Sequence, residues 1–172
     1  MKITKELLKE KGACAAGYRD FLKEYPVDKY PDGVEYQELL DCCAEKDFSY
    51  GSWLLGAFGK TDEVRKIDGD LIVEKGIIFA GRLEVKGCIK AGWGIDVGGG
   101  IEAGFGIKAD ESIRAGLGIK AGYGIEAGDE FGIYAGLHFR ITNKTQRKII
   151  AKERPENIMC GEFEEKKDDA VR

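Results

Sequence analysis

The chain has 172 residues, of which 43% are hydrophobic and 34% are charged, and its net charge is −4 with a pI of about 5.3. This acidic balance disfavours general attraction to nucleic-acid phosphates, and no apolar run approaches the ~18 residues of a membrane span. No apolar segment follows the initial Met-Lys, so we expect a soluble, cytoplasmic protein whose five cysteines are reduced and mostly buried.

Composition divides the chain into three segments. Residues 71–141 hold 17 of the 25 glycines and no proline, whereas all three prolines lie outside this range. We therefore predict a helical module over residues 1–66, a glycine-rich repeat domain over 67–141, and a closing hairpin with a charged tail over 142–172.

The first segment has the signals of short helices. Thr4 is a candidate N-cap, with Ile3 and Leu8 placed as a hydrophobic staple, and Gly12 can end that helix. A second helix follows and stops at Pro26.

A capping box formed by Asp32 and Glu35 is expected before a third helix, and a fourth carries Trp53, Leu54 and Phe58. The aromatic side chains of this segment predict a small helical core, and a partner-binding face is the alternative.

An aliphatic residue recurs every six positions from Leu71 to Ile125. A two-residue insertion near Asp129 and Glu130 then moves the series to Ile133. A period of six fits neither a helix nor a hairpin meander. It predicts a triangular β-solenoid with three hexads, or about 18 residues, in each coil, and it leaves the handedness of the coil open.

The other hexad positions agree with this prediction. The second position is usually charged and the third is small or apolar, which is the alternation of a strand with one buried face. Glycine at the fourth and sixth positions predicts corners with positive φ. Large third-position side chains at Val73, Phe79 and Val85 give way to alanines, so the coil is expected to taper.

A repeat of 18 residues also predicts which second-position residues stack in rows. Opposite charges on neighbouring rungs are expected to form solvated pairs rather than a catalytic dyad. The predicted rows are Ile72, Lys90, Lys108 and Glu126; Ile78, Asp96 and Arg114; and Glu84, Glu102 and Lys120.

Fifth positions carry unexpected apolar bulk at Trp93, Phe105, Leu117 and Tyr123. If these side chains point inward at the corners they belong to the core, an orientation that we slightly favour. If they point outward they form an apolar wall that would bind a partner or a second copy. We take all four as candidate partner-binding residues. The helical segment is expected to cap the wide end of the coil and the hairpin the other end, because a bare end exposes sheet edges.

The sequence offers little catalytic chemistry. Hexad solenoids resemble the hexapeptide acyltransferases, which use a histidine base, and His138 is the only histidine here. It has no orienting partner in the sequence, so we expect a structural or surface role. Alanine follows the aliphatic residue by two positions, whereas that family places its small residue two before it. We expect no metal and no cofactor.

Three stretches resemble proteins of bacteriophages and prophages. "LLKEKGACAAGYRDFLKEYP" with "DFSYGSWLL" resembles their small helical module, and "IIAKERPENIMCGEF" resembles their closing segment. The resemblance implies a phage-encoded accessory protein that acts in the host cytoplasm. By analogy, it implies a non-catalytic inhibitor of a host protein or complex, for example an anti-CRISPR, and possible homodimers. The alternatives are an acyltransferase-like enzyme using His138 and a self-assembling protein similar to bactofilins.

Overall fold

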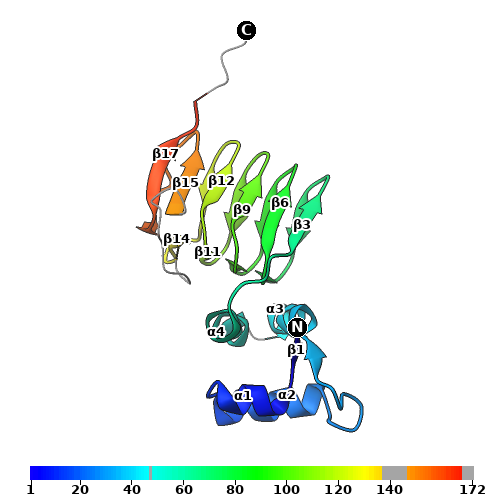
Figure 1. Cartoon of the computed structure of the whole chain (residues 1–172). Coiled ribbons are helices and arrows are strands. Elements are labelled where there is room, and N and C mark those ends of the chain that lie inside the picture. The colour runs from blue at the N-terminus through cyan, green and yellow to red at the C-terminus, as the bar shows by residue number, and fades with distance from the viewer. Residues whose placement is uncertain (47, 137–146, 168–172) are drawn as a thin grey trace.

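The computed structural model describes residues 1–46, 48–136 and 147–167. Within these ranges, helices come first and a parallel β-solenoid of three sheets follows, as the hexad pattern predicts. Figure 1 shows the helices beneath the row of solenoid strands that runs from β3 to β17. The helical core includes Ile78 and Ala80 of the solenoid, so the module is joined to an early coil.

The helical module consists of α1 (Lys5–Glu10), α2 (Ala15–Glu24), α3 (Tyr36–Lys46) and α4 (Phe48–Phe58), with β1 (Lys2–Ile3) paired antiparallel to β2 (Val34–Glu35). The predicted N-cap is confirmed, because Thr4 Oγ1 accepts a hydrogen bond from the Leu7 N–H at 3.3 Å. Gly12 follows α1 with a φ of +78°, as expected of a helix-ending glycine.

The expected capping box before α3 is wrong. Glu35 belongs to β2, where it lies opposite Lys2, and α3 begins directly after it at Tyr36. The Tyr36 N–H donates to the Met1 carbonyl at 2.8 Å. Strand pairing with the N-terminus therefore supplies the acceptor that a local cap would have supplied.

The three sheets of the solenoid are numbered here by their order along the chain. Sheet 1 consists of β3 (Val64–Ile67), β6 (Arg82–Val85), β9 (Ile101–Ala103), β12 (Ile119–Ala121), β15 (Lys148–Ala151) and β17 (Glu162–Glu165). Sheet 2 consists of β4 (Leu71–Val73), β7 (Ile89–Ala91), β10 (Ile107–Ala109) and β13 (Ile125–Glu126). Sheet 3 consists of β5 (Ile77–Phe79), β8 (Ile95–Val97), β11 (Ile113–Ala115), β14 (Ile133–Ala135) and β16 (Ile158–Cys160).

The register of the coils confirms the 18-residue repeat. Ile107 pairs with Ile89 on one side and with Ile125 on the other, and all three side chains are buried. The predicted outward rows are also confirmed. Two residues of these rows are buried, however. The helical module covers Ile78, and Asp96 is 0% exposed.

Corner glycines are required for a reason other than the expected one. Among the described residues of the repeat, Gly136 has a positive φ, whereas the fourth-position glycines of the hexads before it do not. A Cβ at Gly104 would lie 1.9 Å from the carbonyl oxygen of Lys86, and one at Gly122 would lie 1.7 Å from that of Gly104. Each such glycine therefore allows one coil to stack directly on the carbonyl of the coil before it.

The boundaries of the solenoid differ from those predicted. Its first strand, β3, begins at Val64 rather than near residue 67, and pairs in parallel with β6. The predicted closing hairpin over 142–172 is wrong, because β15 pairs in parallel with β12 and β17, and β16 pairs in parallel with β14. Short apolar runs around a turn are common to hairpins and crossovers. Here the preceding coil offers an open strand edge to each new strand. This favours parallel pairing, in which Phe163 lies opposite Ile149.

The helical module closes the free edge of β5, as expected for a cap at the wide end. Gln37 of α3 donates from Nε2 to the Ile78 carbonyl at 2.8 Å, and its Oε1 accepts from the Ala80 N–H at 3.0 Å. One side-chain amide thus replaces a neighbouring strand. Helix α4 also packs closely against β5, because a Cβ at Gly51 would lie 2.2 Å from Ile78 Cδ1.

The glycine contacts predict a sharp contrast between two substitutions in one coil. Gly122→Ala should lower the free energy of unfolding by about 3 kcal/mol, because the methyl group would overlap the carbonyl of Gly104. Gly124→Ala should leave it unchanged or raise it by up to about 1 kcal/mol, since nothing lies within 4 Å of its Cβ position. Urea unfolding followed by circular dichroism measures both. Equal effects of the two substitutions would contradict the steric explanation.

Candidate interaction surface

Phe105 and Tyr123 form a stacked aromatic pair on the outside of the solenoid. Both lie at the corner between sheets 1 and 2, one coil apart, and they are 51% and 52% exposed. Their ring centroids are 5.7 Å apart and the planes differ by 3°. The slight preference for a core orientation is therefore wrong for these two residues. Strand alternation points the first and third residues of each hexad inward. It does not apply to the fifth residue, which lies at a corner.

Trp93 and Leu117 do not join this pair. Trp93 lies at the corner between sheets 2 and 3, and Leu117 at the corner between sheets 3 and 1, and both are half-buried. The Lys75 ammonium lies over the Trp93 ring, 5.4 Å from its centroid, which is within the distance of a cation–π contact. The four candidate residues predicted from the sequence therefore occupy three different corners.

We name the column formed by Gly87, Phe105, Tyr123 and Lys152 the aromatic corner. Backbone N–H groups link it from coil to coil: Phe105 donates to Gly87, Tyr123 to Phe105 and Lys152 to Tyr123, at 2.8–3.2 Å. The Lys152 ammonium covers the Tyr123 ring at 5.0 Å. Sequence reasoning missed Lys152, because an irregular 29-residue interval separates it from Tyr123.

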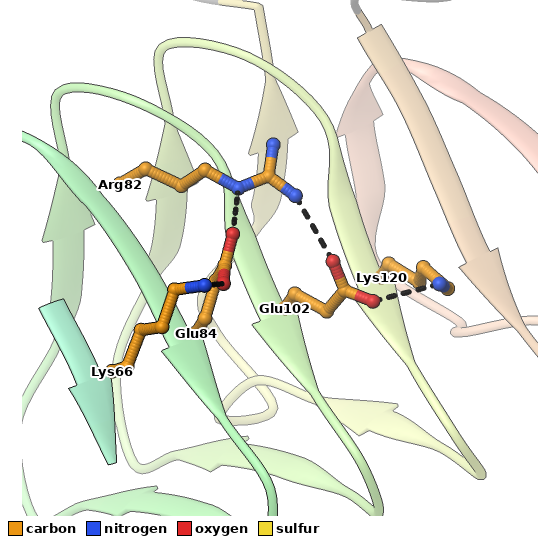
Figure 2. Close-up of polar contacts among 5 residues, drawn as sticks. All are labelled: Lys66, Arg82, Glu84, Glu102 and Lys120. Carbon is orange, nitrogen blue, oxygen red and sulfur yellow. Dashed lines mark hydrogen bonds and ion pairs between the residues drawn. The ribbon is translucent and has the colours of Figure 1, made fainter. Parts of the chain in front are cut away.

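A ladder of charges runs along the outer face of sheet 1 beside this corner (Figure 2). Arg82 bridges Glu84 and Glu102 at 2.8 and 2.9 Å, and Lys66 and Lys120 pair with the same two carboxylates at 3.4 and 2.7 Å. Hydrogen bonds from Lys120, and the charge of Arg82, lower the pKa of Glu102. Each carboxylate lies between cations, which suits solvated pairing across strands and not proton transfer.

An ionic contact joins the helical module to sheet 3. The Arg114 guanidinium lies 3.8 Å from the buried Asp96 carboxylate and donates to Ser52 Oγ of α4 at 3.2 Å. Nearby Tyr36 is buried, and this burial together with the Asp96 charge raises the pKa of its phenol. Its hydroxyl donates to backbone carbonyls of Leu54 and Gly59. These polar groups fix the module in place; they do not line an open site.

A cavity of about 390 Å³ lies within the helical module and was not anticipated from the sequence. Its walls come from all four helices and include Phe21, Tyr50 and Trp53. Tyr25 also lines it, and burial with a hydrogen bond to Cys42 raises the pKa of the Tyr25 phenol. No sequence signal indicates such a cavity, because it depends on how helices distant in the chain pack together.

A second hollow, of about 680 Å³, lies along sheet 2 beneath residues 153–157. Its lining alternates Lys90, Lys108 and Arg154 with acidic side chains such as Glu126 and Glu153. Lys108 and Glu126 pair directly at 2.6 Å. The charges largely compensate one another, so this hollow favours no single ligand charge.

Other expectations about reactive groups have mixed outcomes. All five cysteines are free, as expected, but of these Cys43 alone is buried, because the others lie on helix surfaces and solenoid corners or edges. Within the described residues, no cluster of three or more His, Cys, Asp and Glu side chains could hold a metal ion. No described helix is long and apolar enough to cross a membrane. His138 lies outside the described residues.

Comparisons of this chain with protein-family models, with curated proteins and with solved structures give no match. The class that the fold defines is a parallel β-solenoid with an N-terminal helical module.

The pKa of Glu102 leads to a prediction for stability against pH. Because its pKa is lowered in the fold, its contribution is present above its ordinary pKa of 4.5 and is lost as the pH falls through the lowered value. Glu102→Gln should therefore reduce the free energy of unfolding at pH 7 by up to about 1 kcal/mol, since the pairs are largely exposed. This deficit should shrink below pH 4.5. Urea unfolding at several pH values measures it.

The matched control for this prediction is Glu130→Gln, because Glu130 is exposed and forms no ion pair among the described residues. It should change stability little at any pH. A Glu102→Gln deficit that stayed constant down to pH 3 would contradict the electrostatic origin.

Proposed function

We propose that this chain is a non-catalytic binding protein that presents the aromatic corner to a macromolecular partner. One observation carries the proposal: Phe105 and Tyr123 are stacked, half-exposed rings on a rigid backbone corner. The interior is already filled by buried rows of isoleucine and alanine, so the rings are not needed to complete the core. Exposed aromatics that the fold does not require are typical anchors of interfaces.

The rigidity of the corner favours binding by these rings. Their backbone groups are hydrogen-bonded to the coils on both sides, and the two rings stack with nearly parallel planes. Binding would therefore remove little conformational freedom from this backbone and these side chains. A side chain that loses little conformational entropy gives more of its contact energy to affinity.

The ends of the solenoid argue against the alternative of a polymer built by end-to-end stacking. At the N-terminal end, the Arg65 guanidinium lies 4.3 Å from the centroid of the inward-facing Phe79 ring. At the C-terminal end, Arg154 lies over Phe163 at 5.6 Å. A cation over each end of the core, together with Gln37 on the edge of β5, opposes the addition of another coil.

In its specific form, the proposal is an inhibitor that a phage encodes against a host protein or complex, such as an anti-CRISPR. Its support is the resemblance of the helical module and closing segment to phage and prophage proteins. A second copy of the chain is the competing occupant of the same surface, since an exposed apolar patch also favours symmetric dimers.

The double substitution Phe105→Ser with Tyr123→Ser tests this proposal. It should leave the circular dichroism spectrum unchanged and weaken binding of the partner, or dimerisation, about 30-fold or more, because it removes about 2 kcal/mol of anchor contacts. Light scattering measures the mass in solution, and quantitative capture from bacterial lysate measures partner binding.

The matched control is Trp93→Ser with Leu117→Ser, which removes apolar bulk from the other two corners. We expect binding to be retained. If the Phe105 and Tyr123 variant kept both its mass and its partner, the surface would be excluded, and the cavity beside Trp53 in the helical module would become the site to examine.

A further inference from the structure

We propose that the open face of Phe105 is a slot for a cationic side chain of the partner, above all the guanidinium of an arginine. This inference rests on the proposed function and names the chemistry that the aromatic corner recognises. The slot is formed by the Phe105 ring, the bare backbone of Gly87 and the Asp70 carboxylate.

The column leaves space on one side of the aromatic pair. Tyr123 covers one face of Phe105, whereas the next rungs on the other side are Gly87 and then Gly69, which have no side chains. Neighbouring rungs of a sheet are about 4.8 Å apart. A flat group placed beside Gly87, one rung beyond Phe105, would therefore continue the stack on the ring face that Tyr123 leaves open.

The Asp70 carboxylate gives this space a negative charge. A Cβ at Gly87 would lie 2.0 Å from Asp70 Oδ1, so the carboxylate occupies the place where that side chain would begin. Oδ1 accepts the Cys88 N–H at 2.7 Å, which holds the group in position. Asp70 is exposed, and among the described residues it pairs with no cation. A ligand over Phe105 would thus meet an aromatic face and a fixed anion together.

Six rings of the protein carry a cation of the same chain. Lysine or arginine groups of the chain lie 4.3–5.9 Å from the ring centroids of Tyr18, Phe79, Trp93, Tyr123, Tyr134 and Phe163. No described cation covers Phe105 in this way. Lys108, the nearest lysine to Phe105 in sequence, pairs with Glu126 at 2.6 Å, and Lys86, which precedes Gly87, pairs with Asp68 at 2.7 Å. The open face of Phe105 therefore lacks the kind of group that covers these six rings.

Arginine fits this slot better than other charged groups. Its guanidinium is planar and weakly hydrated, so it stacks on a ring while its N–H groups donate to a carboxylate at its edge. A nucleic acid also offers flat groups, but its phosphates would be repelled by Asp70 and by the net charge of −4. The chemistry favours an arginine on the surface of a protein.

The test uses the intact protein and three small probes: acetyl-Gly-Arg-Gly-amide and the same peptide with lysine or with citrulline in place of arginine. Titrations are followed by the aromatic carbon–proton resonances of Phe105 and Tyr123. We expect millimolar binding that decreases in the order arginine, lysine, citrulline. We also expect binding to weaken as salt is added, because the carboxylate contact is screened.

Two substitutions separate the ring from the charge. Phe105→Leu keeps apolar bulk but removes the π face, and Asp70→Asn keeps an oxygen for the Cys88 N–H but removes the charge. Each substitution should weaken the binding of the arginine probe at least five-fold, while Trp93→Leu at another corner should not change it. Thermal unfolding checks that each variant is folded.

Equal binding of arginine and citrulline, or full binding by Asp70→Asn, would overturn the inference. Preferential binding of an oligonucleotide such as oligo-dT to the same resonances would also overturn it. If the serine double variant at Phe105 and Tyr123 loses the partner while the arginine probe does not bind, the arginine slot is wrong and the proposed function stands. If neither the partner nor the probe depends on these rings, both are wrong.

Discussion

The structure depends on the direct stacking of each coil on the one before it. Parallel ladders join equivalent strands 18 residues apart, and at the corners the backbone N–H groups of one coil bond to carbonyls of the preceding coil. The approach is so close that a Cβ at Gly92, Gly104 or Gly122 would overlap a carbonyl oxygen. A solenoid of this kind has no freedom to shift one coil sideways, so every position in a hexad meets its own equivalent in the next coil.

Because of this constraint, equivalent residues of successive coils form rows, and each residue must be compatible with its neighbours in the row. Isoleucines stack into continuous buried columns, whose apolar burial stabilises a chain that is rich in glycine. Like charges that become neighbours in a row repel one another unless an opposite charge lies between them. Glu84 and Glu102 are neighbours on sheet 1, and Arg82, which lies outside the row, bridges them (Figure 2). Two aromatics in one corner column are likewise placed one coil apart, and their rings stack.

The ends of such a stack are its weak points, because open edges and an exposed core invite further strands. Here the helical module covers one edge at the N-terminal end. Gln37 supplies an amide to the edge of β5, and arginines lie over inward-facing rings at both ends. The helical module therefore does more than precede the solenoid, since it also seals one corner and buries Asp96 against Arg114. The corner between sheets 1 and 2 is not used by this contact, which leaves the aromatic corner available for the proposed role.

The sequence by itself determined the repeat, the three-sided coil, the inward rows and the outward charge rows. These features follow from local alternation and from a constant 18-residue separation, and both can be read along the chain.

Tertiary structure decided the rest. Phe105 and Tyr123 point outward because a corner is not bound by strand alternation. β15 to β17 join existing sheets in parallel because the exposed edges of the preceding coil already supply partner strands, with a register shift where β16 joins β14. The cavity in the helical module and the carboxylate beside Gly87 arise from contacts between segments without periodic spacing. Such contacts depend on how whole elements pack, and the pattern along the chain carries no record of them.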